Sequence, residues 1–507
     1  MPTNSYDLIV LGDDLAGLVA ATLCARRGLR TLVLGREDRP ARYALGPLRL
    51  PVEPGILPGR GAGAAARVIR ELGLDHALKR KVRDVRVTAQ LVAPDVRIDL
   101  ATESAMQLRE LEREVPGEAE AITGVWTDAA EVARAADAVL DGDDAFPGVG
   151  FFERRDVAKQ TVRLAETAAA WWAKVEAISP GAAALTRLPA AVGGRAVDPP
   201  PVAIARALDL WRQGAPSIRG DGTGLRELLL EKLQAAGGEL RVAAVTELVQ
   251  GWSKISAVKL ASGEELGAGQ VIAAMPAVEL VALFGKKPPK RLVEIAGAAK
   301  VLGWRYVLNV VIDAAGVPEG MAPIVLYVAD GDLPLAGANA FTIHVAEPDD
   351  QGRAVVTLAT VLPAEGDGAP ATPAVGELAG RTARLRAGLL EQLEQVMPFA
   401  QDHLVLAHSP HEDTPPVAPG GRGTYDVGRG LPAAMSAVFA GTLEGSAGLA
   451  AAPYGSGVKN LTLASAQVLP TLGLEGDLVV GWSAAREACG IAGKKRDYLR
   501  DEVVSNA

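Results

Sequence analysis

The stretch YDLIVLGDDLAGLVAATLCARRGLRTLVL (residues 6–34) decides the fold of this chain. Its apolar start, Tyr6 to Leu11, predicts a buried strand, and Leu15 to Arg27 has the apolar spacing of a helix. Gly28 ends that helix, and Arg30 to Leu34 predicts a second strand. A strand, tight turn, helix and strand within about 30 residues form a βαβ unit. We therefore expect an α/β fold with a parallel sheet.

The turn of this unit, GDDLAG (12–17), nearly matches the G-x-G-x-x-G signature of dinucleotide-binding turns. Gly12 and Gly17 keep the glycines that make the turn and allow close packing of helix and strand. Asp14 replaces the glycine that lets a pyrophosphate approach the backbone. A carboxylate about 5 Å from one phosphate charge costs on the order of 3 kcal/mol at an effective dielectric near 20. That cost equals roughly a hundredfold in affinity.

The acidic pair at this turn has two interpretations. Asp is a favoured N-cap, and a helix N-terminus attracts an anion. The carboxylate of Asp13 or Asp14 is therefore predicted to bond an N–H of the first helical turn, in the place of a phosphate. In the alternative, Asp14 turns outward or is neutralised by a nearby Arg, and a nucleotide still binds.

The composition is that of an ordinary globular protein, with 507 residues, 49% hydrophobic and 22% charged. A net charge of −9 argues against broad binding to nucleic acid. Cys24 and Cys489 are expected to be small core residues. The chain shows no signal peptide and no uncharged apolar segment of roughly 18 residues. We expect a cytoplasmic protein.

The rest of the chain alternates helical and strand patterns. Residues 85–100 predict a hairpin, 103–213 are mostly helical, and 304–362 predict an antiparallel sheet. The other expected elements are a helix at 224–236, strands at 239–249, 255–260 and 270–274, a helix at 375–396 and a last helix at 481–489.

Two further stretches make the pattern more specific. The central GDGTGLRELLLEKLQAAGGELRVAAVTELVQG (220–251) and the closing NLTLASAQVLPTLGLEGDLVVGWSAA (460–485) resemble motifs of the phytoene desaturase and flavin amine oxidase superfamily. The closing motif aligns without a gap through Asn460, Pro470, Gly473, Glu475, Gly476, Gly481, Ala484 and Ala485.

The resemblance implies a Rossmann-like FAD-type domain interleaved with an α+β substrate or cap domain. The FAD-type domain would comprise residues 1–75, 215–285 and 430–490. The cap domain would comprise 76–214 and 286–429, and 491–507 would form a tail. The cleft between the two domains is expected to be mainly apolar, since the family handles lipid-like molecules.

The same resemblance implies where FAD would be held. By the match, Val245 lies where a backbone group faces the adenine. The cofactor-binding positions it implies are Gly12, Asp14, Gly17, Glu37, Val245, Ser465, Ala466 and Gly476. No acid or base of the family can be carried onto a residue here, so the catalytic residues stay unknown.

Three of the cofactor positions depart from the family. Besides Asp14, Gly35 stands where the family has a Glu that holds the ribose hydroxyls. Glu37 is out of register for that role, although it could reach back, and Arg36 beside Gly35 would suit a 2′-phosphate. Ser465 and Ala466 stand where the family writes GD, and DRPARYALG (38–46) replaces its GGR. The packing glycines are retained, while three residues at cofactor contacts are replaced. This combination suggests that the fold is kept although its cofactor site is no longer maintained.

Other stretches have plainer explanations. HSPHED (408–413) has histidines three residues apart, but in a Pro-flanked loop this is unspecific, so we expect no metal. KKPPKR (286–291) is expected to be a solvated loop, although a basic patch would also suit an anionic membrane surface.

Two functions follow. The first is an FAD-dependent oxidoreductase that takes a hydride from a large apolar polyene or isoprenoid, or from an amine. The second is a flavin-free pseudo-oxidoreductase that keeps the fold as a binding module or as a subunit of a larger assembly. The expected partner is an apolar small molecule or lipid, with peripheral membrane contact and oligomer formation left open.

Overall fold

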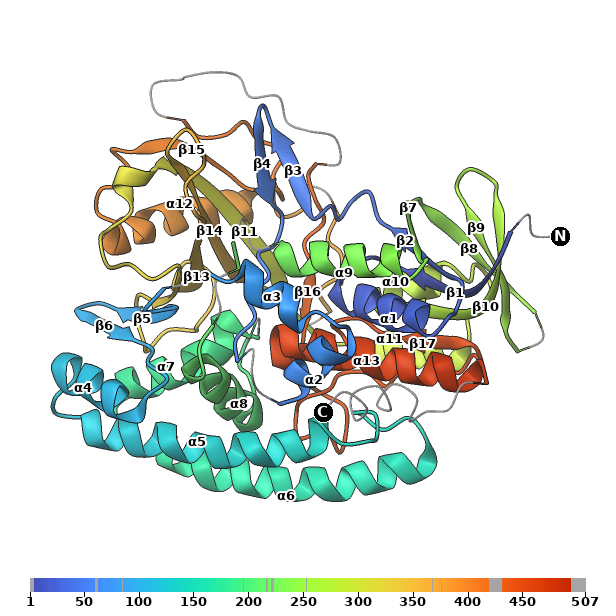
Figure 1. Ribbon diagram of the computed structural model, residues 1–507, viewed down its shortest axis with the longest axis horizontal. Helices are drawn as coiled ribbons and strands as arrows, with labels where there is room; N and C mark the ends of the chain where they lie inside the picture. The colour runs from blue at the N-terminus through green and yellow to red at the C-terminus, as the bar shows by residue number, and fades with distance from the viewer. Residues whose placement is uncertain are drawn as a thin grey trace.

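The first strand, β1 (Asn4–Leu11), lies inside a seven-stranded sheet with the order β7-β2-β1-β10-β9-β8, in which β17 also pairs with β10 (Figure 1). This computed structural model describes residues 4–493 apart from 60–62, 84, 195, 216–217, 220–222, 252, 367, 375 and 419–430. The other strands of the sheet are β2 (Thr31–Gly35), β7 (Glu239–Val242), β8 (Val245–Gln250), β9 (Ile255–Leu260), β10 (Glu265–Ala273) and β17 (Leu461–Leu463).

The predicted βαβ unit is confirmed. β1 and β2 are parallel, and α1 (Leu15–Arg26) connects them. β10 is parallel to both β1 and β17, so the two ends of the chain share one sheet, as the three sequence motifs predict. Helix α1 packs against α9 (Gly224–Ala235) and α13 (Gly473–Ile491). The structure is thus the Rossmann-like α/β type.

Cys24 and Cys489 lie at the contact of α1 and α13. Both are buried, and their sulfur atoms are 4.0 Å apart. Their predicted role as small core residues is confirmed.

A second sheet of eight strands has the order β15-β11-β14-β13-β12-β5-β6, with β16 paired to β11. Leu385, Leu389 and Leu393 of α12 (Ala379–Val396) belong to the apolar cluster of this sheet. The strands are β5 (Ala89–Ala93), β6 (Val96–Asp99), β11 (Val301–Asp313), β12 (Ile324–Val328), β13 (Ala340–Val345), β14 (Arg353–Pro363), β15 (Leu404–His408) and β16 (Ala437–Phe439).

Two segments that the sequence assigns to the FAD-type domain pair or pack with the second sheet instead. β16 is assigned to the FAD-type domain by sequence, yet it pairs with β11 of the second sheet. The hairpin of β3 (Arg42–Leu45) and β4 (Leu48–Pro51) shares an apolar cluster with Val311 and Leu406 of that sheet. Both segments pair or pack by contacts that are distant in the sequence, which local patterns do not reveal.

Other expected elements are confirmed or corrected. β5 and β6 form the predicted hairpin. The single strand expected at 239–249 is two strands, β7 and β8, which lie at opposite edges of the sheet. The helix expected from Val375 begins at Ala379 as α12, and Val375 itself lies outside the described residues.

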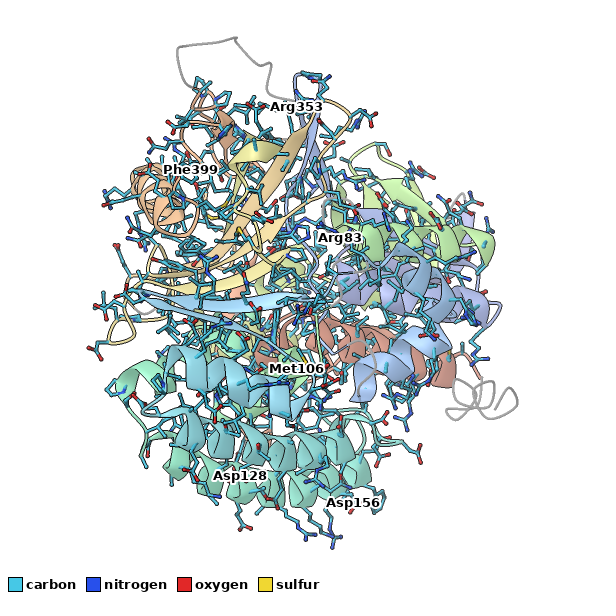
Figure 2. All side chains as sticks on the ribbon, turned by 60° about the vertical axis from the view of Figure 1, so that its left-hand side comes forward. Arg83, Met106, Asp128, Asp156, Arg353 and Phe399 are labelled. Carbon is cyan, nitrogen blue, oxygen red and sulfur yellow. The ribbon has the colours of Figure 1, made fainter. Side chains whose placement is uncertain are left out.

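A helical layer covers one side of the molecule, with the long helices α5 and α6 at the bottom of Figure 1. Lys174 of α6 binds Asp128 of α5 at 2.7 Å, and Asp128 and Asp156 lie on the outer side of this layer (Figure 2). The layer comprises α4 (Ser104–Glu114), α5 (Ala119–Leu140), α6 (Phe151–Val175), α7 (Pro180–Leu188), the π-helix η1 (Pro189–Gly193) and α8 (Pro201–Arg212).

Short helices complete the fold. They are α2 (Gly63–Glu71), α3 (Asp75–Lys81), α10 (Ala277–Ala282), α11 (Lys290–Ala298), η2 (Ala314–Gly316) and η4 (Pro470–Leu472). Within the described part of the chain, every helix is too short or too polar to cross a membrane.

Candidate functional site

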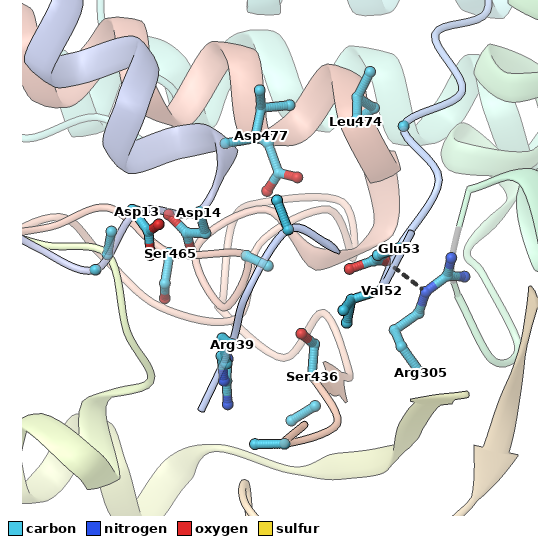
Figure 3. Close-up of a pocket in the computed structure, with 18 of the residues that line it drawn as sticks. Asp13, Asp14, Arg39, Val52, Glu53, Arg305, Ser436, Ser465, Leu474 and Asp477 are labelled. Carbon is cyan, nitrogen blue, oxygen red and sulfur yellow. Dashed lines mark hydrogen bonds and ion pairs between the residues drawn. The ribbon is translucent and has the colours of Figure 1, made fainter. Parts of the chain in front are cut away.

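A cavity of about 220 Å³ lies where the turn after β1 faces β11 and β16 of the second sheet (Figure 3). Its wall is formed by segments from both chain ends and from the middle of the chain. Parallel strands direct their following turns to one edge of a sheet, and ligand sites of α/β folds lie in the crevice outside that edge. The cavity therefore occupies the position expected for a functional site.

Gly12 and Gly17 have the two roles expected from their spacing. Gly12 has φ +98°, and a Cβ there would lie 2.5 Å from the carbonyl oxygen of Ala274. A Cβ on Gly17 would lie 2.7 Å from the Cβ of Ala274. Gly12 thus makes the turn and lines the cavity, while Gly17 allows α1 to pack closely on the sheet.

Asp14 is the N-cap of α1. Its Oδ1 accepts a hydrogen bond of 3.0 Å from the backbone N–H of Gly17. The predicted capping carboxylate is therefore confirmed. Asp14 lines the cavity and is exposed to it. The protein around the turn removes part of the water from its carboxyl group, and this desolvation together with the nearby carboxylate of Asp477 raises the pKa of Asp14 to about 8.

Asp13 covers the end of β2. A Cβ on Gly35 would lie 3.1 Å from the carboxyl carbon of Asp13, whose residue is 7% exposed. Arg226 donates to both the carboxylate and the backbone carbonyl of Asp13. The carboxylate of Asp13 thus fills the space beside Gly35. Sequence reasoning missed this pair because Asp13 and Arg226 are 213 residues apart.

Besides Gly17, three of the expected cofactor positions lie outside the cavity wall. Glu37 is exposed beyond the end of β2, which agrees with its unsuitable register. Val245 begins β8 at the sheet edge and is half-buried. Gly476 has a packing role, because a Cβ there would lie 2.5 Å from the carbonyl oxygen of Leu469.

The neighbours of Gly476 on α13 reach the cavity instead. Gly473, Leu474 and Asp477 line its wall. Figure 3 shows the Asp477 carboxylate pointing from the helix toward the turn that holds Asp13 and Asp14. The closing motif therefore contributes to the site through residues that the family alignment did not single out as ligands.

Ser465 and Ala466 line the cavity as expected. The next residue, Gln467, was not predicted. Its Oε1 accepts a hydrogen bond of 2.8 Å from the backbone N–H of Ala277, and it is 2% exposed. Its Nε2 has no hydrogen-bond partner among the described residues. A buried amide donor without an acceptor is costly, so this atom calls for a ligand or a bound water.

Positive groups stand opposite the acidic turn. Arg305 binds Glu53 at 3.0 Å, and both line the cavity (Figure 3). Arg39 contacts Glu279 at 3.4 Å and Thr372 at 3.3 Å. Burial and the charge of the neighbouring Arg36 hold the pKa of Arg39 below its usual range. The wall thus carries both signs of charge.

The histidine stretch does not gather into one site. The Nδ1 of His411 lies 2.9 Å from the carbonyl oxygen of Ala433, and burial lowers the pKa of His411 to about 4. Glu412 accepts a 2.6 Å hydrogen bond from the hydroxyl of Tyr306. His408 instead faces the hydroxyl of Tyr43 at 3.2 Å. Among the described residues, no group of three His, Cys, Asp or Glu side chains is placed to hold a metal ion.

Most of the residues that line the wall are apolar, as predicted for the cleft, although the wall also carries charged residues. Apolar side chains such as Val307, Phe439 and Leu474 line one part of it. The charged residues of the wall are Asp13, Asp14, Arg36, Arg39, Glu53, Arg226, Arg305 and Asp477. Such a wall suits a small amphipathic molecule.

No protein-family model matches the chain, and no curated protein matches its sequence. A solved oxidoreductase from Methanosarcina mazei superposes with a TM-score of 0.54 at 14% identity, over 94% of this chain and 99% of that one. Wild-type putrescine oxidase bound to putrescine superposes with a TM-score of 0.54 at 16% identity, over 97% of this chain and 100% of that one. The chain therefore has the fold of these oxidoreductases, in agreement with the FAD-type architecture expected from the sequence.

Proposed function

We propose that this chain is a flavin-free relative of flavin oxidoreductases that binds a small molecule in the cavity between its two sheets. The observation that carries this proposal is the hydrogen bond from the N–H of Gly17 to the carboxylate of Asp14. In a dinucleotide site, the N–H groups at this helix N-terminus bind the pyrophosphate. The carboxyl group of the chain itself takes the place of that phosphate.

Contacts at the other cofactor positions support the same conclusion. The space beside Gly35 holds the carboxylate of Asp13, which is already engaged by Arg226. Ala466 offers no polar side-chain atom at the cavity wall. The residues present therefore do not fit FAD unless Asp13 and Asp14 rearrange.

The cavity measures about 220 Å³ and is partly open to solvent, so a longer ligand is free to extend out of it. The cavity suits a molecule of the size of a single ring with a polar group, because an apolar cavity of about 150 Å³ already holds benzene.

A second candidate is an FAD-dependent oxidoreductase that acts on a large apolar polyene or isoprenoid, or on an amine. The raised pKa of Asp14 favours it, because a protonated Asp14 does not repel a phosphate at neutral pH. The retained Gly12 and Gly17 and the fold shared with the solved oxidoreductases also favour it.

Titration of FAD into the purified protein separates the two candidates. It is carried out roughly two pH units below and above the pKa of Asp14, which is about 8. We expect a protein without flavin absorbance that binds no FAD at either pH. Binding at the lower pH that weakens at the higher pH would support the oxidoreductase, and tight binding at both would refute the flavin-free proposal.

A further inference from the structure

Two neighbouring phenylalanines at the start of α6 lie on the surface. Phe151 is 69% exposed and Phe152 is 74% exposed. In the described part of the chain, no other two exposed large apolar residues are adjacent in sequence. Apolar side chains that folding leaves in water are common singly, but when they are grouped they mark an interaction surface.

The first turn of α6 is fixed to the body of the protein by its inner side. Glu153, which is 9% exposed, accepts hydrogen bonds of 3.1 and 3.2 Å from the N–H groups of Val149 and Gly150. Its other carboxylate oxygen lies 3.3 Å from the guanidinium of Arg486 on α13. The phenylalanines are therefore held on the outer side of a well-anchored helix end.

Basic side chains accompany the phenylalanines on this outer side. Positions i, i+4, i+8 and i+11 lie on one side of a helix that has 3.6 residues per turn. Counted from Phe151, these positions hold Arg155, Lys159 and Val162, and all of them are exposed. Asp156 of the same turns lies on the outside of the helical layer (Figure 2). We call this surface the α6 face, and it comprises Phe151, Phe152, Arg154, Arg155, Lys159, Val162 and Arg163.

The charge of the α6 face is opposite to that of the whole chain. Four of its exposed residues are basic, whereas the net charge of the chain is −9. The only exposed acid within residues 151–163 is Asp156, which lies 3.7 Å from Lys159. Asp143 and Glu166 are the exposed acids on either side of this stretch. The α6 face thus combines apolar surface with local positive charge.

A membrane surface fits this combination better than a protein partner does. A stable protein interface buries roughly 800 Å² on each partner, whereas a phenylalanine buries roughly 150–250 Å², so the apolar part of the α6 face is too small. Two copies that met through the same face would bring like charges together. A helix with aromatic and basic side chains on its outer face instead lies in the headgroup region of a bilayer, where anionic lipids attract the basic groups.

We infer that the α6 face binds the surface of membranes that contain anionic lipids. Phe151 and Phe152 enter the boundary between headgroups and acyl chains, and Arg155 and Lys159 contact the lipid phosphates and carboxylates. The inference assigns membrane contact to α6 and not to the basic loop 286–291, which contains no aromatic residue. It goes beyond the proposed function, since the cavity takes no part in it.

Vesicle flotation of the purified full chain tests the inference. The probes are phosphatidylcholine vesicles with and without roughly 30% phosphatidylserine. We expect partition onto the anionic vesicles to exceed that onto the neutral ones by roughly tenfold or more, and to fall as salt is added, because salt screens the attraction. Equal partition onto both kinds of vesicle, or no binding to either, would overturn the inference.

The phenylalanines are tested by the double variant Phe151→Ser with Phe152→Ser. It should lose roughly tenfold or more of the partition onto anionic vesicles, because the inserted apolar surface is gone. The control is Phe399→Ser, which changes a phenylalanine that is 63% exposed at the opposite end of the molecule from Asp156 (Figure 2) and should have no effect. All three side chains are exposed, so the thermal midpoints should stay close to that of the wild type. Wild-type partition by the double variant would refute the assignment.

The basic residues are tested by Arg155→Gln with Lys159→Gln. This variant should also lose roughly tenfold or more of the partition onto anionic vesicles. Lys286→Gln with Lys287→Gln removes the same charge from exposed positions of the basic loop and is the matched control. A loss seen only in the loop variant would place the membrane contact at 286–291 and contradict the role of α6.

Sedimentation equilibrium covers the remaining occupant, a second copy of the chain. A dimer that the two phenylalanine substitutions dissociate, in a chain that binds no vesicles, would overturn the membrane contact. None of these measurements depends on FAD, so this inference and the flavin-free function fail separately.

Discussion

Replacing Asp13 by Ala, Asp14 by Gly and Gly35 by Glu in one chain is expected to create FAD binding. Asp14→Gly removes a carboxylate that, when ionised, costs on the order of 3 kcal/mol at about 5 Å from a phosphate charge. Gly at an N-cap loses only a few tenths of a kcal/mol relative to Asp, roughly, so the helix is kept. The recovered charge energy corresponds to roughly a hundredfold in FAD affinity above the pKa of Asp14.

The structure makes the change at Asp13 necessary. A Glu at position 35 alone would place its Cβ 3.1 Å from the carboxyl carbon of Asp13 and bring two carboxylates together. Asp13→Ala removes that conflict and releases Arg226 to pair with a phosphate.

The assay is isothermal titration with FAD roughly two pH units above the pKa of about 8, where wild-type Asp14 is ionised. The matched control is the double variant Asp14→Gly with Gly35→Glu, which should bind more weakly than the triple variant. A triple variant that binds FAD no better than the wild type, or a wild type that binds as tightly, would refute the reasoning.

Three further predictions concern stability. The folded chain keeps the proton of Asp14 up to its pKa of about 8, whereas the unfolded chain releases it near 3.8, so this residue lowers stability as the pH rises between those values. Asp14→Asn should therefore raise the thermal midpoint relative to wild type near pH 8 and not near pH 4, and an equal change at both would contradict the assignment. Arg206, which is 1% exposed, binds Glu475 at 2.6 Å, so Arg206→Met should destabilise the fold by about 3–5 kcal/mol in urea unfolding by leaving a buried charge unpaired. Gly12→Ala should cost at least about 1 kcal/mol in the same assay, because its φ is +98° and its Cβ would meet the carbonyl oxygen of Ala274; a neutral effect would argue against this turn geometry.

The fold could be predicted because its deciding contacts are local. The βαβ unit follows from apolar runs and glycines within residues 6–34, and the cap by Asp14 spans only three residues. The order of three motifs places β1, β10 and β17 in one sheet. The individual cofactor positions stay predictions; the structure shows that Gly476 packs against Leu469 and that Val245 lies outside the cavity wall.

By itself the sequence determined that a glycine turn precedes α1 and that an acid caps it, since backbone conformation and capping act between near neighbours. Only the tertiary structure decided that Asp13 lies over Gly35 and pairs with Arg226, and that Gln467 and Arg39 each contact the first turn of α10. Apart from Asp13 beside Gly35, these contacts join residues 190 to 240 positions apart, and each depends on which strands lie side by side. Whether a hydrogen-bond donor lacks a partner, or a side chain fills the space beside a glycine, depends on that arrangement. Neither can therefore be predicted from the sequence.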